Sequence, residues 1–456
     1  MSLSLAAVAG LGRRTVAGML VVSGQGFRDW TAAYRLFARA RVDPEGLFDA
    51  VKAGIDEQLP PGAPYVTHMD DTLLPKTGKK IPGTAWRRDP QGPKFQTNLV
   101  WAQRFLQLSA TLRFGPGPGE ATVIPIDFVH APTPKKPKKN APIEERRRYE
   151  RERKETALPR VAAQRLHRLR AWLDARPGGK DRMLQAVGDG GYTNATVLKG
   201  LPERTVFTGR LRKDAELYFL PAPEDGAGQG RNRTYGKRAP TPEALLRDPS
   251  MPFQEVKAWA AGKEHAFRVK TLAPLLTRMN GGRQALRLVC IAPLGYRPRK
   301  GSRLLYREPA YLGRTGPDRP LEDVVQAFAW RWGIEVNHRD EKTLLGVGEA
   351  QVRTPEAAAR VPALLAATYA MLLLAARQAF GAAPLPDTLP RPKWQRAKGR
   401  THASTVELIR HLRAELWGRA LGLAHFSRFA TRPPTDANGE KCARPRVDAA
   451  VLYASQ

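Results

Sequence analysis

The sequence is poor in cysteine: Cys290 and Cys442 are the two among 456 residues, and they lie far apart. This scarcity excludes a disulfide framework and a cysteine-based zinc site, because both need several closely spaced thiols. Acidic residues are also few, with 43 Asp and Glu against 75 Lys and Arg, a formal net charge of +32. Such a basic excess predicts a polyanionic partner, most often nucleic acid, because neutralised phosphates release condensed counterions. A generally basic proteome or a ribosome-bound factor is the alternative.

Long apolar runs are absent as well. The longest, residues 361–376, has 16 residues between Arg360 and Arg377, whereas a helix that crosses a bilayer takes about 20. We therefore expect a buried core helix and no membrane partner. The apolar run near the N-terminus has its arginines after it, which favours the start of a helix over a signal peptide. These features predict a soluble, cytoplasmic protein.

Apolar spacing divides the first part of the chain into three segments. Residues 1–60 have helical spacing and predict a small basic helical domain, either a cap on the main core or a DNA-contacting module. Residues 64–130 have the pattern of an antiparallel run of strands. The charged insert at 132–153 predicts a solvated loop that runs into a charged helix, or a segment that contacts phosphates.

The rest of the chain alternates between strand-rich and helical segments. A strand at 183–187, between helices at 161–175 and 193–201, ends in an acid, and functional side chains often follow the carboxyl end of a strand. Residues 203–318 are strand-like and lack a long helical period. Further helices are expected at 321–345, 354–380 and 403–420, with a Pro-, Arg- and Lys-rich linker at 383–400 and a poorly ordered tail from residue 431.

Three acidic positions coincide with core elements. The pair Asp70 and Asp71 closes an apolar strand, Asp189 closes another, and Glu335 lies inside an apolar helix. Each has an ordinary explanation alone, as a turn, a helix cap or a surface ion pair. Together they are unusual, because an unpaired buried carboxylate is costly. Three carboxylates on two strands and a helix predict a site for two Mg²⁺ or Mn²⁺ ions of the kind used in phosphoryl transfer.

The helix with Glu335 allows a geometric test. Phe328 precedes Glu335 by seven residues and Lys342 follows it by seven, while Arg331 precedes it by four. Seven residues make almost two full helical turns, so these side chains share one face. An acid between cations on that face can bind phosphates. The alternative is a surface row of ion pairs, with Glu335 paired to Arg331 or Arg339. Against that alternative, the apolar side chains of Trp330, Trp332 and Ile334 predict that this helix packs on a core.

At these residues the sequence resembles a DDE transposase of the bacterial insertion-sequence type. That family carries the helix signature Tyr-x2-Arg-x3-Glu-x6-Lys, and the corresponding positions here are Phe328, Arg331, Glu335 and Lys342. Phe328 keeps the ring of the signature tyrosine and lacks its hydroxyl.

The two aspartate motifs of that family also have counterparts. Asp189-Gly190-Gly191-Tyr192 resembles its Asp-x-Gly-Tyr pattern, and Asp70-Asp71-Thr72 resembles its Asp-x-Thr pattern. Neighbours on a strand point to opposite faces, so one of Asp70 and Asp71 faces the site. The Asp-x-Thr alignment favours Asp70, and an alignment on an Asp-Thr pair favours Asp71.

The resemblance implies an α/β (α+β) fold: a ribonuclease-H-like mixed sheet flanked by helices, with a β-rich insertion and a helical N-terminal domain. The implied division of the chain is a helical domain at 1–60, the first catalytic part at 61–202 with the basic insert at 132–153, the insertion at 203–318, the catalytic completion at 319–382, and a linker, helix and tail at 383–456.

The resemblance also implies a function, namely cut-and-paste transposition by a Mg²⁺-dependent endonuclease and strand transferase located at the bacterial nucleoid. Such an enzyme binds terminal inverted repeats and target DNA as a homodimer. Asp70 or Asp71, Asp189 and Glu335 are the implied catalytic and metal-binding residues, and the expected DNA-binding residues are Phe328, Arg331, Lys342, Lys79, Lys80 and Arg339. The alternatives are a ribonuclease-H-like nuclease without joining activity and a catalytically silent, domesticated transposase that binds DNA.

Overall fold

The structure, a computed structural model, describes residues 2–89, 92–93, 95–115, 119–222, 233–297, 301–381, 389, 403–422 and 450–452. Most of the predicted linker and tail therefore lies outside the described residues. The predicted helix at 403–420 is confirmed as α12 (Thr405–Ala420), which begins at a capping box formed by Ser404 and Glu407.

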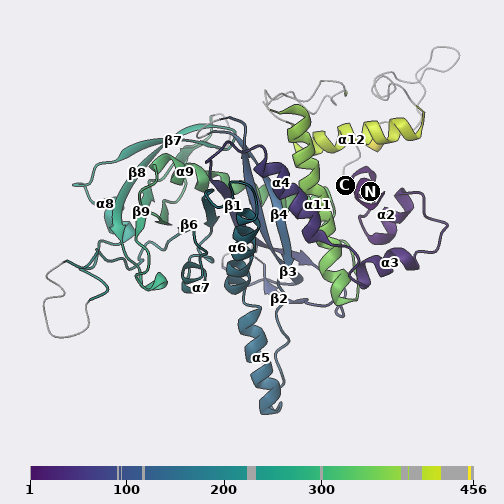
Figure 1. The fold of residues 1–456 in the computed structure, drawn as a ribbon, viewed down its shortest axis with the longest axis horizontal. Coiled ribbons are helices and arrows are strands. Elements are labelled where there is room, and N and C mark those ends of the chain that lie inside the picture. Colours follow the sequence, from purple (N-terminus) through teal and green to yellow (C-terminus); the bar gives the residue numbers. More distant parts are fainter. Residues whose placement is uncertain are drawn as a thin grey trace.

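The centre of the molecule is a ten-stranded mixed sheet (Figure 1). Its first half contains β1 (Tyr65–Pro75), β2 (Ala85–Arg88), β3 (Leu99–Arg113), β4 (Ala121–His130), β5 (Leu184–Gly188) and β6 (Thr205–Arg210). The strands β1, β5 and β6 are parallel neighbours, whereas β3 is antiparallel to β1, and both β2 and β4 are antiparallel to β3. The predicted antiparallel run at 64–130 is confirmed by β1 to β4.

The second half of the sheet comes from the strand-rich segment 203–318. It contains β7 (Gln254–Ala260), β8 (Lys263–Leu275), β9 (Leu286–Ile291) and β12 (Ala310–Thr315), all antiparallel to their neighbours. β12 pairs with β6, so these strands continue the same sheet. β10 (Gly295–Tyr296) and β11 (Leu305–Tyr306) form a separate small hairpin. β6 also belongs to this segment, yet it pairs in parallel with β5.

Helices cover both faces of the sheet. On one face, Val66 and Val187 pack against Ala327 and Trp330 of α9 (Leu321–Trp330). On the other, the ring of Tyr65 meets Trp172 of α6 (Leu158–Asp174) edge to face, with 6.4 Å between centroids. The predicted α+β mixed sheet flanked by helices is thus confirmed, and it is compatible with a ribonuclease-H-like arrangement. Between β5 and β9 along the chain there are also two short helices, α7 (Ala195–Lys199) and α8 (Pro242–Arg247), and the 3₁₀ helix η2 (Arg278–Asn280).

The N-terminal helices pack on the main body. α1 (Ser2–Ala9) lies against α2 (Val16–Val22) and α12, while α3 (Thr31–Ala38) and α4 (Pro44–Asp56) lie against α11 (Pro355–Phe380). Phe48, Val51 and Ile55 of α4 are buried in the main core. The N-terminal segment is therefore built into the core through its apolar helix faces.

The helix α11 is the one described helix that is long and apolar enough to cross a membrane, and 78% of its most apolar window is buried inside the protein. It packs on β4 and α4. Burial of this kind is what a core helix requires, because its apolar face is removed from water by neighbouring elements.

The structure corrects two sequence expectations. The strand with Asp70 and Asp71 does not end there: it continues to Pro75 because β3 goes on pairing with it, Asp70 opposite Gln107. The helix expected at 321–345 is divided at Arg331 into α9 and α10 (Trp332–Thr343). The Arg331 N–H bonds to the Phe328 carbonyl and the Ile334 N–H to that of Arg331, which is the tighter i to i+3 pattern.

A close approach accompanies this division. A Cβ atom added to Gly333 would lie 2.5 Å from the side chain of Val123 on β4. Glycine therefore allows the first turn of α10 to lie against the sheet, and the tight junction sets the direction of α10 across β1 and β4.

Candidate active site

The parallel strands β1 and β5 position two of the predicted aspartates. Their pairing ends at Met69 opposite Gly188; Asp70 is the next residue of β1, and Asp189 is the first residue after β5. Side chains at matching positions of neighbouring strands point to the same face. The two carboxylates are close enough to interact, because the negative charge of Asp189 raises the pKa of Asp70. Asp189 itself accepts a hydrogen bond of 2.8 Å from the Gly191 N–H.

The junction between α9 and α10 faces this end of β1. Arg331 Nη1 lies 3.6 Å from Asp70 Oδ2, and Arg331 Nη2 donates a 2.8 Å hydrogen bond to Glu335 Oε1. Burial lowers the pKa of Lys342, and the charges of Glu341 and, to a smaller extent, Asp70 oppose that change. The structure therefore brings Asp70, Arg331, Glu335 and Lys342 together, with Asp189 beside Asp70.

Asp71 points to the opposite face of β1, as its position next to Asp70 requires. The hydroxyl of Tyr192 donates a 3.2 Å hydrogen bond to Asp71 Oδ1. Burial raises the Asp71 pKa, the nearby Arg104 and the Tyr192 hydrogen bond lower it, and the charge of Asp189 raises it, as it does for Asp70. Asp71 thus has partners of its own that do not include Arg331 or Glu335.

The electrostatics of Asp70 follow from its burial. Desolvation raises its pKa to about 7, with Arg331 lowering it and the charges of Asp189 and Asp71 raising it further. His68, two residues earlier on the same face, is fully buried, and burial together with Arg331 lowers its pKa to about 3. The imidazole is therefore neutral, and the positive charge facing Asp70 comes from Arg331 and Lys342.

The remaining predicted DNA-binding residues lie in three different settings. Lys79 and Lys80 are exposed in the loop between β1 and β2. Arg339 is exposed on α10 and pairs with its neighbour Asp340 at 2.8 Å. Phe328 is partly buried and packs against the apolar core beneath α9, so its ring is directed to the protein interior.

A divalent metal fits these acids by donor type. Carboxylate oxygens are the ligands that Mg²⁺ and Mn²⁺ prefer, and Asp70 is a buried acid that lacks full charge compensation, as its raised pKa shows. In the described part of the chain, however, no three His, Cys, Asp or Glu side chains lie close enough together to hold an ion. Between Asp70 and Glu335 stands the guanidinium of Arg331.

Sequence reasoning missed three residues around this site. Trp332, next to Arg331, is 60% exposed, although it was expected to pack in the core. His338 is buried with its Nε2 unpaired, and burial lowers its pKa to about 3. Glu341 is fully buried, and burial raises its pKa well above the ordinary value. The helical period of α10 could have found His338 and Glu341, because both follow Ile334 and Asn337 on its buried side.

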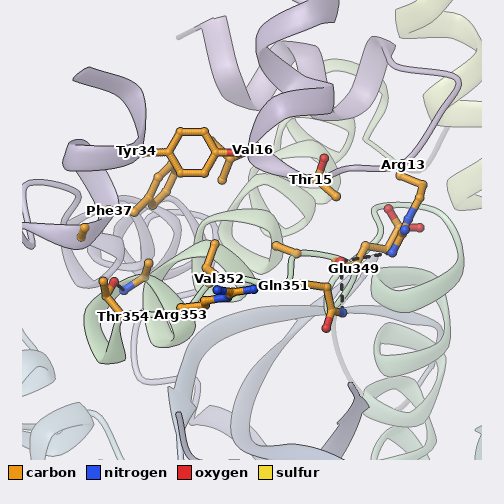
Figure 2. Close-up of a pocket in the computed structure, with 13 residues that line it drawn as sticks. Arg13, Thr15, Val16, Tyr34, Phe37, Glu349, Gln351, Val352, Arg353 and Thr354 are labelled. Atoms are coloured by element: carbon orange, nitrogen blue, oxygen red, sulfur yellow. Dashed lines mark hydrogen bonds between the residues drawn. The ribbon is translucent and has the colours of Figure 1, made fainter. Parts of the chain in front are cut away.

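A cavity of about 490 Å³ lies elsewhere, between the N-terminal helices and the loop that leads into α11. Figure 2 shows its lining, which includes Tyr34, Phe37 and Val352. Glu349 holds one side of this cavity together, since it accepts hydrogen bonds from Arg14 N–H and, at its carbonyl, from Arg13. The cavity contains none of the predicted site residues.

Comparison with known proteins identifies a family for this chain. A family model described as DDE superfamily endonuclease matches residues 2–284, more than half of the chain. The match includes β1 and β5 with Asp70, Asp71 and Asp189, and it ends before α9 and α10. No curated protein matches the chain. The chain belongs to the DDE superfamily endonuclease family, which implies a nuclease that acts on DNA.

Proposed function

We propose that this protein is a transposase of the insertion-sequence type that cleaves transposon ends and joins them to target DNA. The observation that carries the proposal is that Arg331 contacts both Asp70 and Glu335, while Asp189 follows β5 next to the position of Asp70 on the parallel strand β1. The strand order β4-β3-β1-β5-β6, with β1, β5 and β6 parallel, supports a ribonuclease-H-like catalytic domain.

Of the two neighbouring aspartates, Asp70 is the proposed ligand. It shares a face with Arg331 and Glu335, whereas Asp71 bonds to Tyr192 on the other side. Asp70, Asp189 and Glu335 would hold the metal, and bound Mg²⁺ or Mn²⁺ would supply activation of the attacking hydroxyl and stabilisation of the leaving oxygen. Sequence spacing alone left either aspartate open; the contacts of each side chain favour Asp70.

The basic side chains have a separate task. Arg331 balances the charge of Asp70 and Glu335 in the protein without DNA, and Lys342 lies on the same side of the sheet. Both cations can bind a phosphate that enters between them, because Arg and Lys form charge-assisted hydrogen bonds with phosphate oxygens. Lys79 and Lys80, exposed in the loop after β1, are further candidates for phosphate contacts.

Trp332 adds a flat apolar surface next to these cations. Its side chain is 60% exposed at the first position of α10. An exposed aromatic ring beside phosphate-binding groups can stack on a base that has left the duplex, at about 1–3 kcal/mol per base. We therefore include Trp332 among the DNA-contacting residues.

A cleavage and joining assay tests this function. A supercoiled plasmid that carries the element's own ends is incubated with the protein, target DNA and Mg²⁺. Joined products are expected, and they should vanish for Asp189→Asn. Cleavage without joined products would indicate a nuclease of the same chemistry that lacks joining, and end binding without any cleavage would indicate a domesticated DNA-binding protein.

The assembly and location follow from the same proposal. A transposase that pairs two ends acts as a homodimer on DNA, and it works at the bacterial nucleoid. Gel filtration with light scattering, with and without a duplex of the terminal repeat, tests the first point: a dimer is expected in the complex.

A further inference from the structure

The helix α5 (Ile143–Glu155) stands apart from the rest of the described protein. Figure 1 shows it extending away from the body beyond α6. None of its 13 residues is buried. An isolated helix of this length is marginal in water, and most helices are stabilised by packing of an apolar face. The helix is therefore not maintained by the core, and its surface is available to a partner.

The charges of this helix fall into two groups. Arg148 pairs with Glu152 at 3.5 Å, Arg153 pairs with Glu150 at 3.2 Å, and Arg146 donates to the Lys139 carbonyl. In contrast, no ion pair or side-chain hydrogen bond holds any member of a second set within the described residues. These are Arg147, Arg151 and Lys154.

The second set forms a continuous stripe. Its members are spaced by four and then three residues, which places them on one face of a helix over about 10 Å. The segment that leads into the helix is also basic: residues 132–155 contain ten Lys and Arg against five Glu. Apolar anchors are scarce on the helix, which argues against a protein partner, because the centre of a protein interface is apolar.

The helix extends from the same end of the sheet as the candidate site. Thr72 pairs with Phe105, and Phe105 pairs with His130, the last residue of β4. The chain that leads to α5 therefore leaves the sheet at the level of Thr72, two residues past Asp70 and two strands away. Arg87 of β2 fixes this exit by donating a 2.8 Å hydrogen bond to Thr133.

We propose that the stripe Arg147, Arg151 and Lys154 binds the phosphate backbone of the DNA that enters the candidate site, at a position beyond the cleavage point. This inference rests on the proposed function, because the DNA must be placed at Asp70 and Asp189. The stripe is about 10 Å long, which corresponds to roughly three base pairs of B-DNA. The stripe carries no base-reading groups, so it contributes affinity and position, not sequence choice.

Salt dependence of binding tests the stripe. Each phosphate contact contributes about 0.9 to the slope of log affinity against log salt concentration. The triple variant Arg147→Gln, Arg151→Gln, Lys154→Gln of the full chain should therefore bind a terminal-repeat duplex with a slope that is less steep by about 2.7. The matched control is Arg146→Gln, Arg148→Gln, Arg153→Gln, which removes the same charge from the same helix, and its slope should stay near that of the wild type.

A footprint gives a second, independent measure. With the wild type, phosphate ethylation should interfere with binding in a short stretch beside the cleavage position. In the triple variant this stretch, roughly three base pairs long, should be lost, while interference at the cleavage position remains. Circular dichroism of both variants shows whether the fold is retained.

Three results would contradict the proposed role of the stripe in DNA binding. Equal slope changes in both triple variants would indicate diffuse electrostatics, and an unchanged slope in the first variant would indicate no contact. A loss of self-association without DNA in the first variant would indicate a second copy of the chain as the partner. Failure of the wild type to bind any terminal-repeat duplex would instead contradict the proposed function and is recognisable as such.

Discussion

The candidate site and the helix α5 both combine acids with bases, but in opposite surroundings. At the site, Asp70 and Arg331 are largely buried, and desolvation raises the Asp70 pKa to about 7. On α5 the charged side chains are exposed, with Arg148 and Glu152 at least half accessible to water. The two regions have similar charged residues, but their ion pairs differ in energy because water hydrates the pairs on α5 and is largely excluded from those at the site. Charges that are shielded from water suit catalysis, whereas hydrated charges suit reversible binding.

The largest expected effect comes from the site. Asp189→Asn keeps the size of the side chain and its place after β5, and it removes one of the proposed metal-binding carboxylates. Cleavage of a terminal-repeat substrate should fall by about a thousandfold or more, because residues that act together in catalysis cannot replace one another. Filter binding should show end affinity close to that of the wild type.

Asp71→Asn is the matched control for this variant. Its carboxylate lies on the other face of β1, with Tyr192, so the loss of cleavage should be much smaller. A larger loss for Asp71→Asn than for Asp70→Asn would reverse the assignment of the two aspartates.

The next effect concerns a buried ion pair away from the site. Arg165 of α6 forms a bidentate contact with Asp127 of β4, with Nη2 to Oδ1 at 2.8 Å, and the Asp127 carboxyl is buried. Asp127→Asn removes the buried carboxylate that faces Arg165 and leaves the more exposed Glu45 as its remaining charged partner. The free energy of unfolding should therefore fall by about 3 kcal/mol. Urea denaturation measures this change. If the free energy of unfolding does not change, buried and exposed ion pairs contribute equally to stability in this protein.

A smaller effect is expected at Arg331, whose side chain is 17% accessible against 12% for Arg165. Arg331→Met removes the cation that contacts Asp70 and Glu335, and the free energy of unfolding should fall by about 2 kcal/mol because two carboxylates lose their partner. Thermal unfolding at neutral pH provides the measurement. Arg331→Lys, which keeps the charge but loses the second hydrogen-bond donor, should recover part of the loss.

The smallest effect is expected on α5. Arg148→Ala breaks an exposed pair with Glu152, and such pairs contribute about 0.3–0.5 kcal/mol in helices. The unfolding free energy of the whole protein should therefore change by less than about 0.5 kcal/mol. A loss as large as that for Asp127→Asn would show that α5 is coupled to the core, which the burial of its residues does not indicate.

The fold could be predicted from the sequence where a pattern is local. The pattern in 64–130 predicted an antiparallel run of strands, although not the short β2, and the apolar run at 361–376 predicted a buried helix. Pairings between distant segments could not be predicted: nothing in the sequence shows that β12 joins β6 and makes one sheet from two strand-rich segments. Such contacts depend on which surfaces meet after folding, and a single sequence does not encode them locally.

For the candidate site, too, the sequence predicted local features and not the contacts between distant segments. Spacing in the helix placed Arg331, Glu335 and Lys342 on one side, and the structure brings Arg331 and Lys342 to Asp70. Sequence spacing did not decide between Asp70 and Asp71, because the face of a strand residue depends on its neighbours in the sheet. It also placed Trp332 in the core, since an apolar side chain next to Ile334 looks buried until the break at Arg331 turns it outward.

The junction of β6 with β12 has a consequence for how the protein unfolds and evolves. Because β12 shields one edge of β6 and β5 shields the other, the strand-rich segment 203–318 is not a module that could be excised cleanly. Its removal would take β6 itself or leave β6 as an open edge, and exposed edges pair with other chains. We therefore expect both halves of the sheet to melt in one cooperative transition, and a chain shortened before residue 203 to aggregate.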